Sequence, residues 1–175
     1  LYALTTTIFW GIWGALIELP ERAGFPATLV YIVWSLTMIP CAIAGLAIIK
    51  WKLDTDLRSI LLGSTIGLTG AGGQIALFQA LADGPAYLVF PIISLSPAVT
   101  VLLSIFFLKE STTKRHWSGI ILALIAIVLM SFQKPDNSII RGYLWFVFAI
   151  IVFLAWGIQA FYMKKANLVM KAESI

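Results

Sequence analysis

Residues 1–24 read LYALTTTIFWGIWGALIELPERAG, and residues 144–167 read LWFVFAIIVFLAWGIQAFYMKKAN. Each stretch carries a Trp-Gly pair inside an apolar run, at Trp13-Gly14 and at Trp156-Gly157. Seven residues after each of these glycines a charged residue follows, Glu21 in the first stretch and Lys164 in the second. Leu, Ile, Trp, Gly and Ala account for the other matches, so apolar composition explains part of the similarity. We interpret the two stretches as two copies of one structural unit.

The chain as a whole has the composition of an integral membrane protein. Of its 175 residues 61% are hydrophobic and 11% are charged, and the mean hydropathy is +0.97, whereas about 25% of the residues of a soluble domain are charged. Six apolar runs occupy residues 1–19, 26–49, 59–82, 87–108, 117–132 and 143–163. Each is close to the ~20 residues that a membrane-spanning helix needs. Because the runs are continuous rather than alternating, they predict an all-α bundle of six transmembrane helices and not a barrel.

The number of runs defines how the two Trp-Gly copies are related. Four apolar runs separate the copies, so the second copy begins five crossings after the first and is upside down in the bilayer. Inverted repeats of this kind are the ground plan of many secondary transporters. We predict a first five-helix repeat at residues 1–134, an inter-repeat loop at 135–142, and the first helix and start of a truncated second repeat at 143–175. The rest of that second half is expected to lie outside the printed sequence.

The basic residues are distributed unevenly over the two sides of the predicted bundle. Of the twelve Lys and Arg residues, nine follow the second, fourth and sixth runs and three follow the first and fifth. Cytoplasmic loops carry the excess of basic residues, so we expect a cytoplasmic N-terminus. For the location of the chain we expect a multi-pass protein of the bacterial inner membrane. The loop at Glu21-Arg22 is neutral and the one at Lys164-Lys165 is basic, as inversion requires. The net charge of +4 therefore indicates a lipid bilayer, not nucleic acid, as the partner.

Small residues gather on one face of the run 59–82. Gly63, Gly67, Gly70 and Gln74 fall on a common helical face, and such a stripe lets a neighbouring helix approach closely. We expect the glycines to serve packing. The amide of Gln74 needs a polar partner, which is either a neighbouring helix or a water-filled cavity.

The run 87–108 contains Pro91 and Pro97, and each proline removes a backbone hydrogen bond. Ser94 and Ser96 lie between them, followed by Thr100 and Ser104. The hydroxyls can bond back to carbonyls of their own helix. Alternatively, this is the broken, cavity-facing helix of a transport site, and we favour that interpretation because packing alone does not require two prolines.

Glu18 is the one carboxylate inside an apolar run. Intramembrane acids are candidates for function, so Glu18 can carry a coupling proton or bind a cationic group. The alternative is a carboxylate at the outer interface, paired with Arg22 one turn on. Phe161 occupies the matching position of the second copy, so a proton site here is asymmetric.

Deep aromatic residues and amides complete the predicted substrate pathway. A pocket lined with aromatic side chains and a few polar groups suits an amphipathic small molecule. We expect the pathway to be lined by Trp13, Gln74, Ser94, Ser96, Trp156 and Gln159. No catalytic triad, metal-ligand cluster or phosphate loop can be assembled around His116, the only histidine. The sequence therefore predicts neither an enzyme nor a cofactor or metal site.

Five short motifs connect the third to the fifth apolar run. They are Phe78-Gln79-Ala80-Leu81, Gly84-Pro85-Ala86, the proline-bounded stretch Pro91-Ile92-Ile93-Ser94-Leu95-Ser96-Pro97, Leu108-Lys109-Glu110 and Trp117-Ser118-Gly119. Together with the Trp-Gly pairs they resemble the EamA-type domain of the drug/metabolite transporter superfamily. The resemblance implies a ten-helix carrier built from two inverted five-helix halves. It also places Glu110 at the cytoplasmic end of its helix, beside Lys109, Lys114 and Arg115 as potential ion-pair partners.

The function that follows from this resemblance is secondary-active transport of a small organic metabolite, such as an amino acid, a sugar or a drug, by alternating access. Protons or another ion can supply the coupling. Two alternatives remain open at this stage. One is a passive channel or facilitator on the same scaffold, and the other is a non-transporting membrane assembly or lipid-handling protein.

Overall fold

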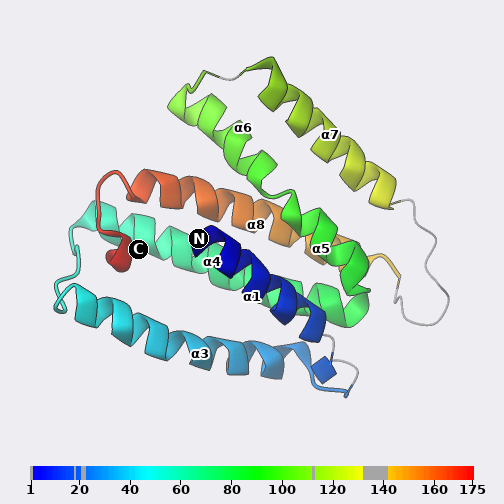
Figure 1. Cartoon of the computed structure of the whole chain (residues 1–175), viewed down its shortest axis with the longest axis horizontal. Helices are drawn as coiled ribbons and strands as arrows, with labels where there is room; N and C mark the ends of the chain where they lie inside the picture. The colour runs from blue at the N-terminus through cyan, green and yellow to red at the C-terminus, as the bar shows by residue number, and fades with distance from the viewer. Residues whose placement is uncertain (1, 18, 21–22, 112, 132–141) are drawn as a thin grey trace.

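The computed structural model describes residues 2–17, 19–20, 23–111, 113–131 and 142–175, and these residues form a helical bundle (Figure 1). The elements are α1 (Tyr2–Leu16), α3 (Ala27–Ile48), α4 (Leu57–Asp83), α5 (Ala86–Ser94), α6 (Pro97–Leu108), α7 (Lys114–Ser131), α8 (Leu144–Ala166) and the short 3-10 helix η1 (Ala172–Ser174). The predicted all-α, polytopic architecture is confirmed.

Four segments of the described chain are long and apolar enough to cross a bilayer. They are α3, α4, α8 and the combined segment Ala86–Leu108, which α5 and α6 divide between them. The other two predicted spans, α1 and α7, are also helices but are shorter, with 15 and 18 residues. At 1.5 Å per residue they rise about 22 and 27 Å, less than the ~30 Å of a hydrocarbon core. The chain is an integral, multi-pass membrane protein.

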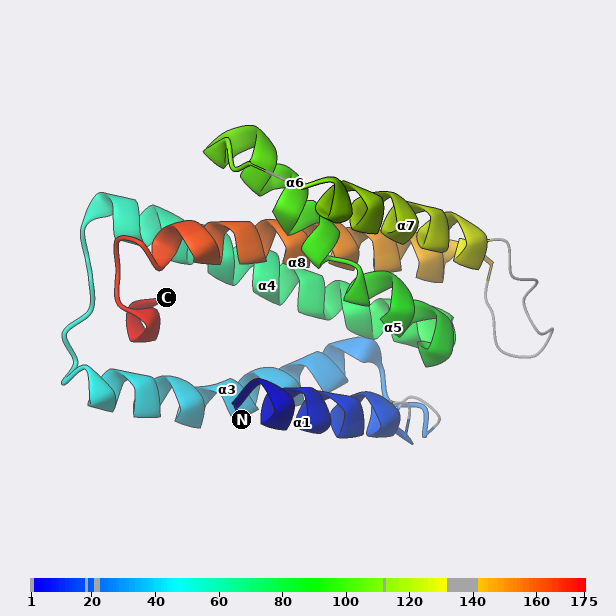
Figure 2. The same ribbon diagram turned by 45° about the horizontal axis from the view of Figure 1, so that its top comes forward.

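The centre of the bundle is the pair α4 and α8, which lie side by side. Figure 2 shows α1 and α3 on one side of this pair and α6 and α7 on the other. Leu77 and Phe78 of α4 are fully buried, as are Ala149 and Val152 of α8 and Val89 of α5. In lipid the stabilisation comes from close packing of these side chains rather than from water exclusion.

Three glycines explain how closely α4 and its C-terminal turn approach α8. A Cβ at Gly70 would lie 2.5 Å from Gln159 Nε2, one at Gly73 would lie 2.5 Å from Trp156 Nε1, and one at Gly84 would lie 2.5 Å from the Trp145 side chain. Only glycine leaves room for these contacts. Gly84 belongs to the Gly-Pro-Ala turn, so that motif has a packing role.

The predicted packing stripe on α4 was wrong for two of its members. A Cβ at Gly63 or Gly67 would meet no described atom within 4 Å, whereas Gly70 packs as expected. The reason is the position of α8, whose bulky Trp156 and Gln159 lie over Gly73 and Gly70. Equal spacing on a helix does not tell where the partner helix makes contact.

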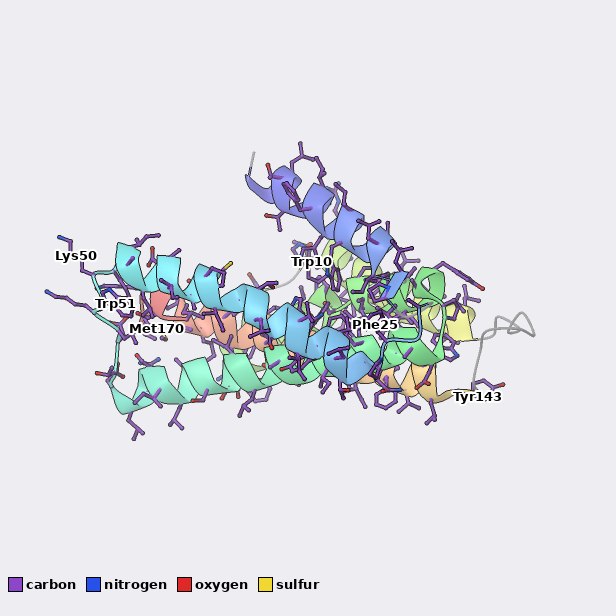
Figure 3. The ribbon with its side chains drawn as sticks, turned by 90° about the horizontal axis from the view of Figure 1, so that it is seen from below. Trp10, Phe25, Lys50, Trp51, Tyr143 and Met170 are labelled. Atoms are coloured by element: carbon purple, nitrogen blue, oxygen red, sulfur yellow. The ribbon has the colours of Figure 1, made fainter. Side chains whose placement is uncertain are left out.

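The two Trp-Gly copies, α1 and α8, run in opposite directions (Figure 1). Phe25, which follows α1, and Tyr143, which precedes α8, lie toward the same end of the bundle (Figure 3). Lys50, Trp51 and Met170 lie at the opposite end, near the loop after α3 and the tail after α8. The loop after α3 and the tail after α8, both rich in basic residues, therefore lie at one end, as the distribution in the sequence predicts.

Candidate functional site

The fourth apolar segment is broken in its middle. α5 ends at Ser94, and α6 begins with Pro97 in its first turn. Between them the amides of Leu95 and Ser96 donate to the carbonyls three residues back, at Ile92 and Ile93 (3.2 and 3.0 Å). Pro97 has no amide hydrogen and cannot continue the α-helical pattern. The sequence-based prediction of a broken helix is correct, and Pro97 rather than Pro91 marks the break.

The hydroxyls near the break satisfy backbone groups in two ways. Ser94 Oγ donates to the carbonyl oxygen of Pro91 at 2.7 Å, within its own helix. Thr100 Oγ1 donates to the carbonyl oxygen of Gly157 at 3.0 Å and so ties α6 to α8. The first alternative, a bond back to the hydroxyl's own helix, is therefore confirmed at Ser94, and the role of this helix in a transport site stays a prediction.

A cavity of about 960 Å³, here called the α5–α6 cavity, lies against this break. Its walls come from α1, α5, the start of α6 and α8. The lining side chains include Thr6, Thr7, Trp10, Tyr87, Phe90, Pro91, Ser94, Ser96, Pro97 and Trp156. Its volume falls in the range of about 300–1,000 Å³ that is typical of sites for small organic ligands. The cavity thus brings the broken helix and the second Trp-Gly copy to one place.

A second cavity of about 1030 Å³, here called the α1–α3 cavity, lies on the other side of α1. It is lined mainly by α1, α3 and α4, with aromatic side chains prominent. Among the lining residues are Phe9, Trp10, Trp13, Phe25, Val33, Trp34, Thr37, Met38, Gln74 and Phe78.

Trp10 belongs to the linings of both cavities and forms part of the wall between them. Its ring centroid lies 5.4 Å from that of Trp156 and 5.6 Å from that of Trp13. Trp13 in turn contacts Phe78 and Phe90, with centroids 6.2 and 6.3 Å away. Ring pairs at these separations attract one another edge to face. These ring contacts link α1 to α4, α5 and α8.

The predicted pathway residues do not form one site. Ser94, Ser96 and Trp156 line the α5–α6 cavity, whereas Trp13 and Gln74 line the α1–α3 cavity. Gln159 lines neither, because its amide packs over Gly70 of α4. Glu18 and Arg22 lie outside the described residues. The division arises because the two groups of residues lie on different sides of α1, whose Trp10 belongs to both linings.

The predicted pathway did not include three aromatic residues that build these walls, namely Trp10, Phe78 and Phe90, although Trp10 was expected to lie as deep as Trp13. Trp10 precedes Trp13 by three residues and so shares its helical face, which is a usable signal. Phe78 directly follows Leu77 in an apolar run, and Phe90 lies within another, so neither carries a sequence signal that separates it from core residues.

One ion pair lies at the basic end of the bundle. Lys164 Nζ lies 2.7 and 2.6 Å from the two carboxylate oxygens of Glu110. Lys109 ends α6 in the left-handed conformation (φ 52°) and so turns the chain just before Glu110. The expected partners of Glu110 were Lys109, Lys114 and Arg115, but it pairs with a residue of the second copy. The partner of Glu110 could not be predicted from nearness in sequence, because α8 passes beside the end of α6.

The side chains that line the two cavities are uncharged in the described part of the chain. Neither lining contains Asp, Glu, Lys, Arg or His among the described residues. A fully charged group is expensive to transfer into such surroundings without a partner. Within the same part of the chain no group of three or more His, Cys, Asp or Glu side chains can hold a metal ion. The surroundings favour uncharged ligands with apolar and hydrogen-bonding parts.

Comparisons with known proteins agree on the class of protein. A family model described as the EamA-like transporter family matches residues 1–132. A probable 4-amino-4-deoxy-L-arabinose-phosphoundecaprenol flippase subunit ArnE of Proteus mirabilis is 28% identical over 110 residues, 61% of this chain and 96% of that protein. Protein LicB of Haemophilus influenzae is 26% identical over 165 residues, 90% of this chain and 54% of LicB.

An uncharacterized protein of Methanocaldococcus jannaschii is 45% identical over 62 residues, which cover 35% of this chain and 45% of that protein. The chain therefore spans about half the length of two of these relatives. No solved structure was found to match.

Proposed function

Since this chain belongs to the EamA-like transporter family, we propose that it moves a small organic metabolite across the membrane by secondary-active, alternating-access transport. The α5–α6 cavity is the part of the pathway that this chain contributes. The family match covers residues 1–132, and the helix at residues 144–166 supplies the remaining wall of the cavity. In this proposal the protein is a carrier and performs no covalent chemistry.

The observation that carries the proposal is how the two Trp-Gly copies meet the broken helix. A Cβ at Gly14 would lie 3.3 Å from the ring of Phe90 in α5, and one at Gly157 would lie 2.8 Å from Ser96 O beside α6. Each copy therefore approaches one half of the same broken helix. Discontinuous helices between oppositely oriented repeats form the binding sites of many carriers.

The cavity suggests the chemical class of the substrate. Ser94 and Ser96 supply hydroxyl and backbone groups, and Trp10 and Trp156 supply apolar faces with indole N–H donors. An uncharged or internally neutralised molecule with several hydrogen-bonding groups fits this lining best. A lipid-linked phosphate, of the kind named in the description of ArnE, is less well matched because neither lining offers a cation among the described residues.

Coupling is assigned to Glu18 on sequence grounds alone. A carboxylate that takes up a proton on one side and releases it on the other can link transport to the proton gradient. Replacing Glu18 with Gln is expected to abolish accumulation against a gradient and to leave exchange down a gradient intact. Accumulation by the Gln variant at the rate of the unaltered protein would show that Glu18 does not couple transport, and a lack of accumulation by the unaltered protein would support a passive facilitator.

The direct test is solute flux in vesicles that contain the full chain. A broad panel of amino acids, sugars, aromatic amphiphiles and a lipid-linked sugar phosphate is screened for uptake and efflux. A substrate found in this way is measured again with Ser96→Ala, and with Ser118→Ala as the matched control, because the Ser118 hydroxyl bonds to Arg115 O far from the cavity. Loss of one hydrogen bond to the substrate lowers apparent affinity by roughly two- to tenfold. Unchanged fluxes across the whole panel would refute transport.

The orientation also belongs to this proposal. The basic end, which carries Lys50, Lys109 and Lys164, faces the cytoplasm of a bacterial inner membrane, and the N-terminus is on the same side. The end near Phe25 and Tyr143 then faces outward.

A further inference from the structure

We infer that the turn Lys50-Trp51-Lys52, here called the α3–α4 turn, is a docking site for an anionic phospholipid. The two ammonium groups bind the negative headgroup, and the indole of Trp51 lies at the membrane interface. This inference goes beyond the proposed transport pathway, because the turn lines neither cavity. It predicts which lipid gathers beside the turn, whatever solute the protein carries.

The first observation is an unusual backbone at the end of α3. The amide of Lys50 donates to the carbonyl oxygen of Ala47 at 3.1 Å, and that of Trp51 donates to Leu46 at 2.8 Å. This pair of bonds ends many helices, and glycine usually occupies the position of Lys50 because the backbone there is left-handed. Here Lys50 (φ 53°) and Trp51 (φ 60°) both adopt that conformation, which is unfavourable for residues with a side chain. Since glycine would suit the turn better, we expect the two side chains to serve another purpose.

The second observation is that the side chains of the turn have no partner in the protein. All three are exposed, and Trp51 is 66% exposed. Figure 3 shows Lys50 extending away from the end of the bundle. Among the residues that the structure describes, neither ammonium group forms an ion pair, and the Trp51 indole forms no hydrogen bond or ring contact. These groups are therefore available to a molecule outside the protein.

The two carboxylates of the same loop are engaged elsewhere. Asp54 accepts a hydrogen bond from the backbone amide of Lys171 at 2.9 Å, on the side of the tail after α8. Asp56 accepts hydrogen bonds from the hydroxyl and the amide of Ser59 and so caps α4. Both carboxylates thus bind groups of the protein, and neither forms an ion pair with the lysines of the turn.

The overall charge of this end favours a negative partner. Residues 50–58, 109–115 and 164–173 carry nine Lys and Arg against four Asp and Glu, which is an excess of five positive charges. Within these ranges only Thr112 lies outside the described residues, and it is uncharged. Clusters of basic residues directly beside a membrane-spanning helix attract anionic headgroups, by about fivefold for each residue near the surface.

Trp51 favours a lipid over a soluble anion. Ile48, the last residue of α3, is 70% exposed, and α3 is long and apolar enough to cross the bilayer. Trp51 follows Ile48 by three residues, so it lies where the hydrocarbon core meets the headgroups. Indole rings are enriched at this level, and lysine side chains beside them extend toward the headgroups while their methylene groups stay on apolar surface. A free phosphate or nucleotide would make no use of the exposed ring.

The test measures which lipid lies beside the α3–α4 turn. Ile48→Cys on a Cys41→Ala background carries a pyrene label, in liposomes of phosphatidylcholine with a minor share of phosphatidylglycerol. A nitroxide near the ester end of an acyl chain quenches the label, and it is placed on phosphatidylglycerol in one sample and on phosphatidylcholine in the other. We expect phosphatidylglycerol to be enriched roughly two- to fivefold over its bulk share beside the label. The enrichment should be lost in about 1 M salt, where charges are screened within ~3 Å.

Lys50→Gln combined with Lys52→Gln removes both charges and should bring the enrichment down to about onefold. The matched control is Lys114→Gln combined with Arg115→Gln, which removes the same charge at the start of α7. Figures 1 and 2 show α7 and α3 on opposite sides of the pair α4 and α8. The control should therefore keep the enrichment at the label. Circular dichroism confirms that each variant is folded.

Three results would overturn the inference. The first is no enrichment of phosphatidylglycerol in the protein with both lysines present. The second is an equal loss of enrichment in the two double variants, which would assign the effect to the total charge of this end. The third is an enrichment that stays the same in about 1 M salt, which would assign it to the acyl chains. Because the assay uses no transported solute, a failure of transport in the flux panel leaves its outcome unaffected.

Discussion

Lys164 of α8 and Glu110 after α6 form an ion pair in which the lysine Nζ contacts both carboxylate oxygens, at 2.7 and 2.6 Å. The pair joins the end of the fourth apolar segment to the end of the second Trp-Gly copy, 54 residues further along the chain. Lys164 Nζ also lies 3.4 Å from Oγ of the buried Ser104. The contact thus fastens the predicted first repeat to the start of the second at the basic end of the bundle.

This ion pair is expected to contribute little to stability, and the contribution should come from Lys164 and not from Lys114. Both side chains are close to half exposed (43% and 46%), and exposed pairs contribute about 0.2–1 kcal/mol. A double-mutant cycle with Glu110→Gln and Lys164→Gln, followed by thermal unfolding in detergent, should give a coupling energy in that range. The same cycle with Glu110→Gln and Lys114→Gln should give none, and equal coupling in both cycles would contradict the geometry.

Gly72 and Gly73 provide adjacent positions with opposite expected outcomes. A Cβ at Gly73 would lie 2.5 Å from Trp156 Nε1, whereas one at Gly72 would meet nothing within 4 Å. Gly73→Ala should lower the free energy of unfolding by about 1–3 kcal/mol, the usual effect of overpacking. Gly72→Ala should be neutral or stabilising by up to ~1 kcal/mol, because Ala favours helix. Similar effects of both substitutions on denaturation would show that α8 does not pack on Gly73.

Gly157→Ala should impair transport as well as stability. Its Cβ would lie 2.8 Å from both the carbonyl oxygen of Ser96 and Cγ1 of Val99, so α6 and α8 would have to separate. That movement also strains the hydrogen bond from Thr100 to the Gly157 carbonyl. We expect a loss of about 1–3 kcal/mol in stability and a reduced rate of solute flux. Gly67→Ala, at an uncrowded position, is the control and should match the unaltered protein in both measurements.

Asp56 makes the start of α4 sensitive to pH. The Ser59 hydroxyl and then the Ser59 amide donate to its carboxylate at 2.6 and 3.2 Å, and these bonds lower the pKa of Asp56 below its usual 3.8. A lowered folded-state pKa means that the stabilisation is complete above about pH 4 and is lost as the pH falls through the lower folded value. Protection of the Ser59 amide against hydrogen exchange should therefore decrease on acidification.

The control for this effect is Asp56→Asn, which caps helices about as well but does not titrate over this range. The Asn variant should show Ser59 protection that does not change with pH in the acid range. The same acid-dependent loss in both proteins would assign it to another group.

The orientation can be checked with single cysteines. Cys41 is the only cysteine and lies exposed on α3, so Cys41→Ala gives a clean background. Trp51, which precedes Lys52, and the 75% exposed Tyr143 lie at opposite ends of the bundle (Figure 3). In intact cells a membrane-impermeant maleimide should label Tyr143→Cys and leave Lys52→Cys unmodified. The reverse pattern would place the basic end outside.

Several features of the fold followed from local sequence patterns. The six apolar runs predicted helices, and the described residues confirm a helix in each, with the fourth divided at Pro97. This success has a simple reason, because continuous apolar runs and proline act on the backbone locally. The break could therefore be predicted without knowing its neighbours, and so could the gathering of basic residues at one end.

The composition of the site could not be predicted in the same way. Trp13 and Trp156 occupy matching positions, but α1 is largely exposed while α8 lies in the core, so the two rings line different cavities. Gln74 and Gln159 both looked like pathway amides, but one faces a cavity and the other packs over Gly70. Which face of each helix meets a partner depends on side chains that are distant in sequence.

The sequence by itself determined the class of protein, the helices, the helix break and the opposite directions of the two Trp-Gly copies, because hydropathy, proline and crossing number are properties of the chain alone. Only the tertiary structure decided that Glu110 pairs with Lys164, that α8 packs on Gly73 and not on Gly67, and that α1 separates two cavities. These outcomes depend on where α8 lies against α4 and α6. That placement is set by close packing of Trp156, Val99 and the glycines, at separations where a single methyl group decides which contacts fit.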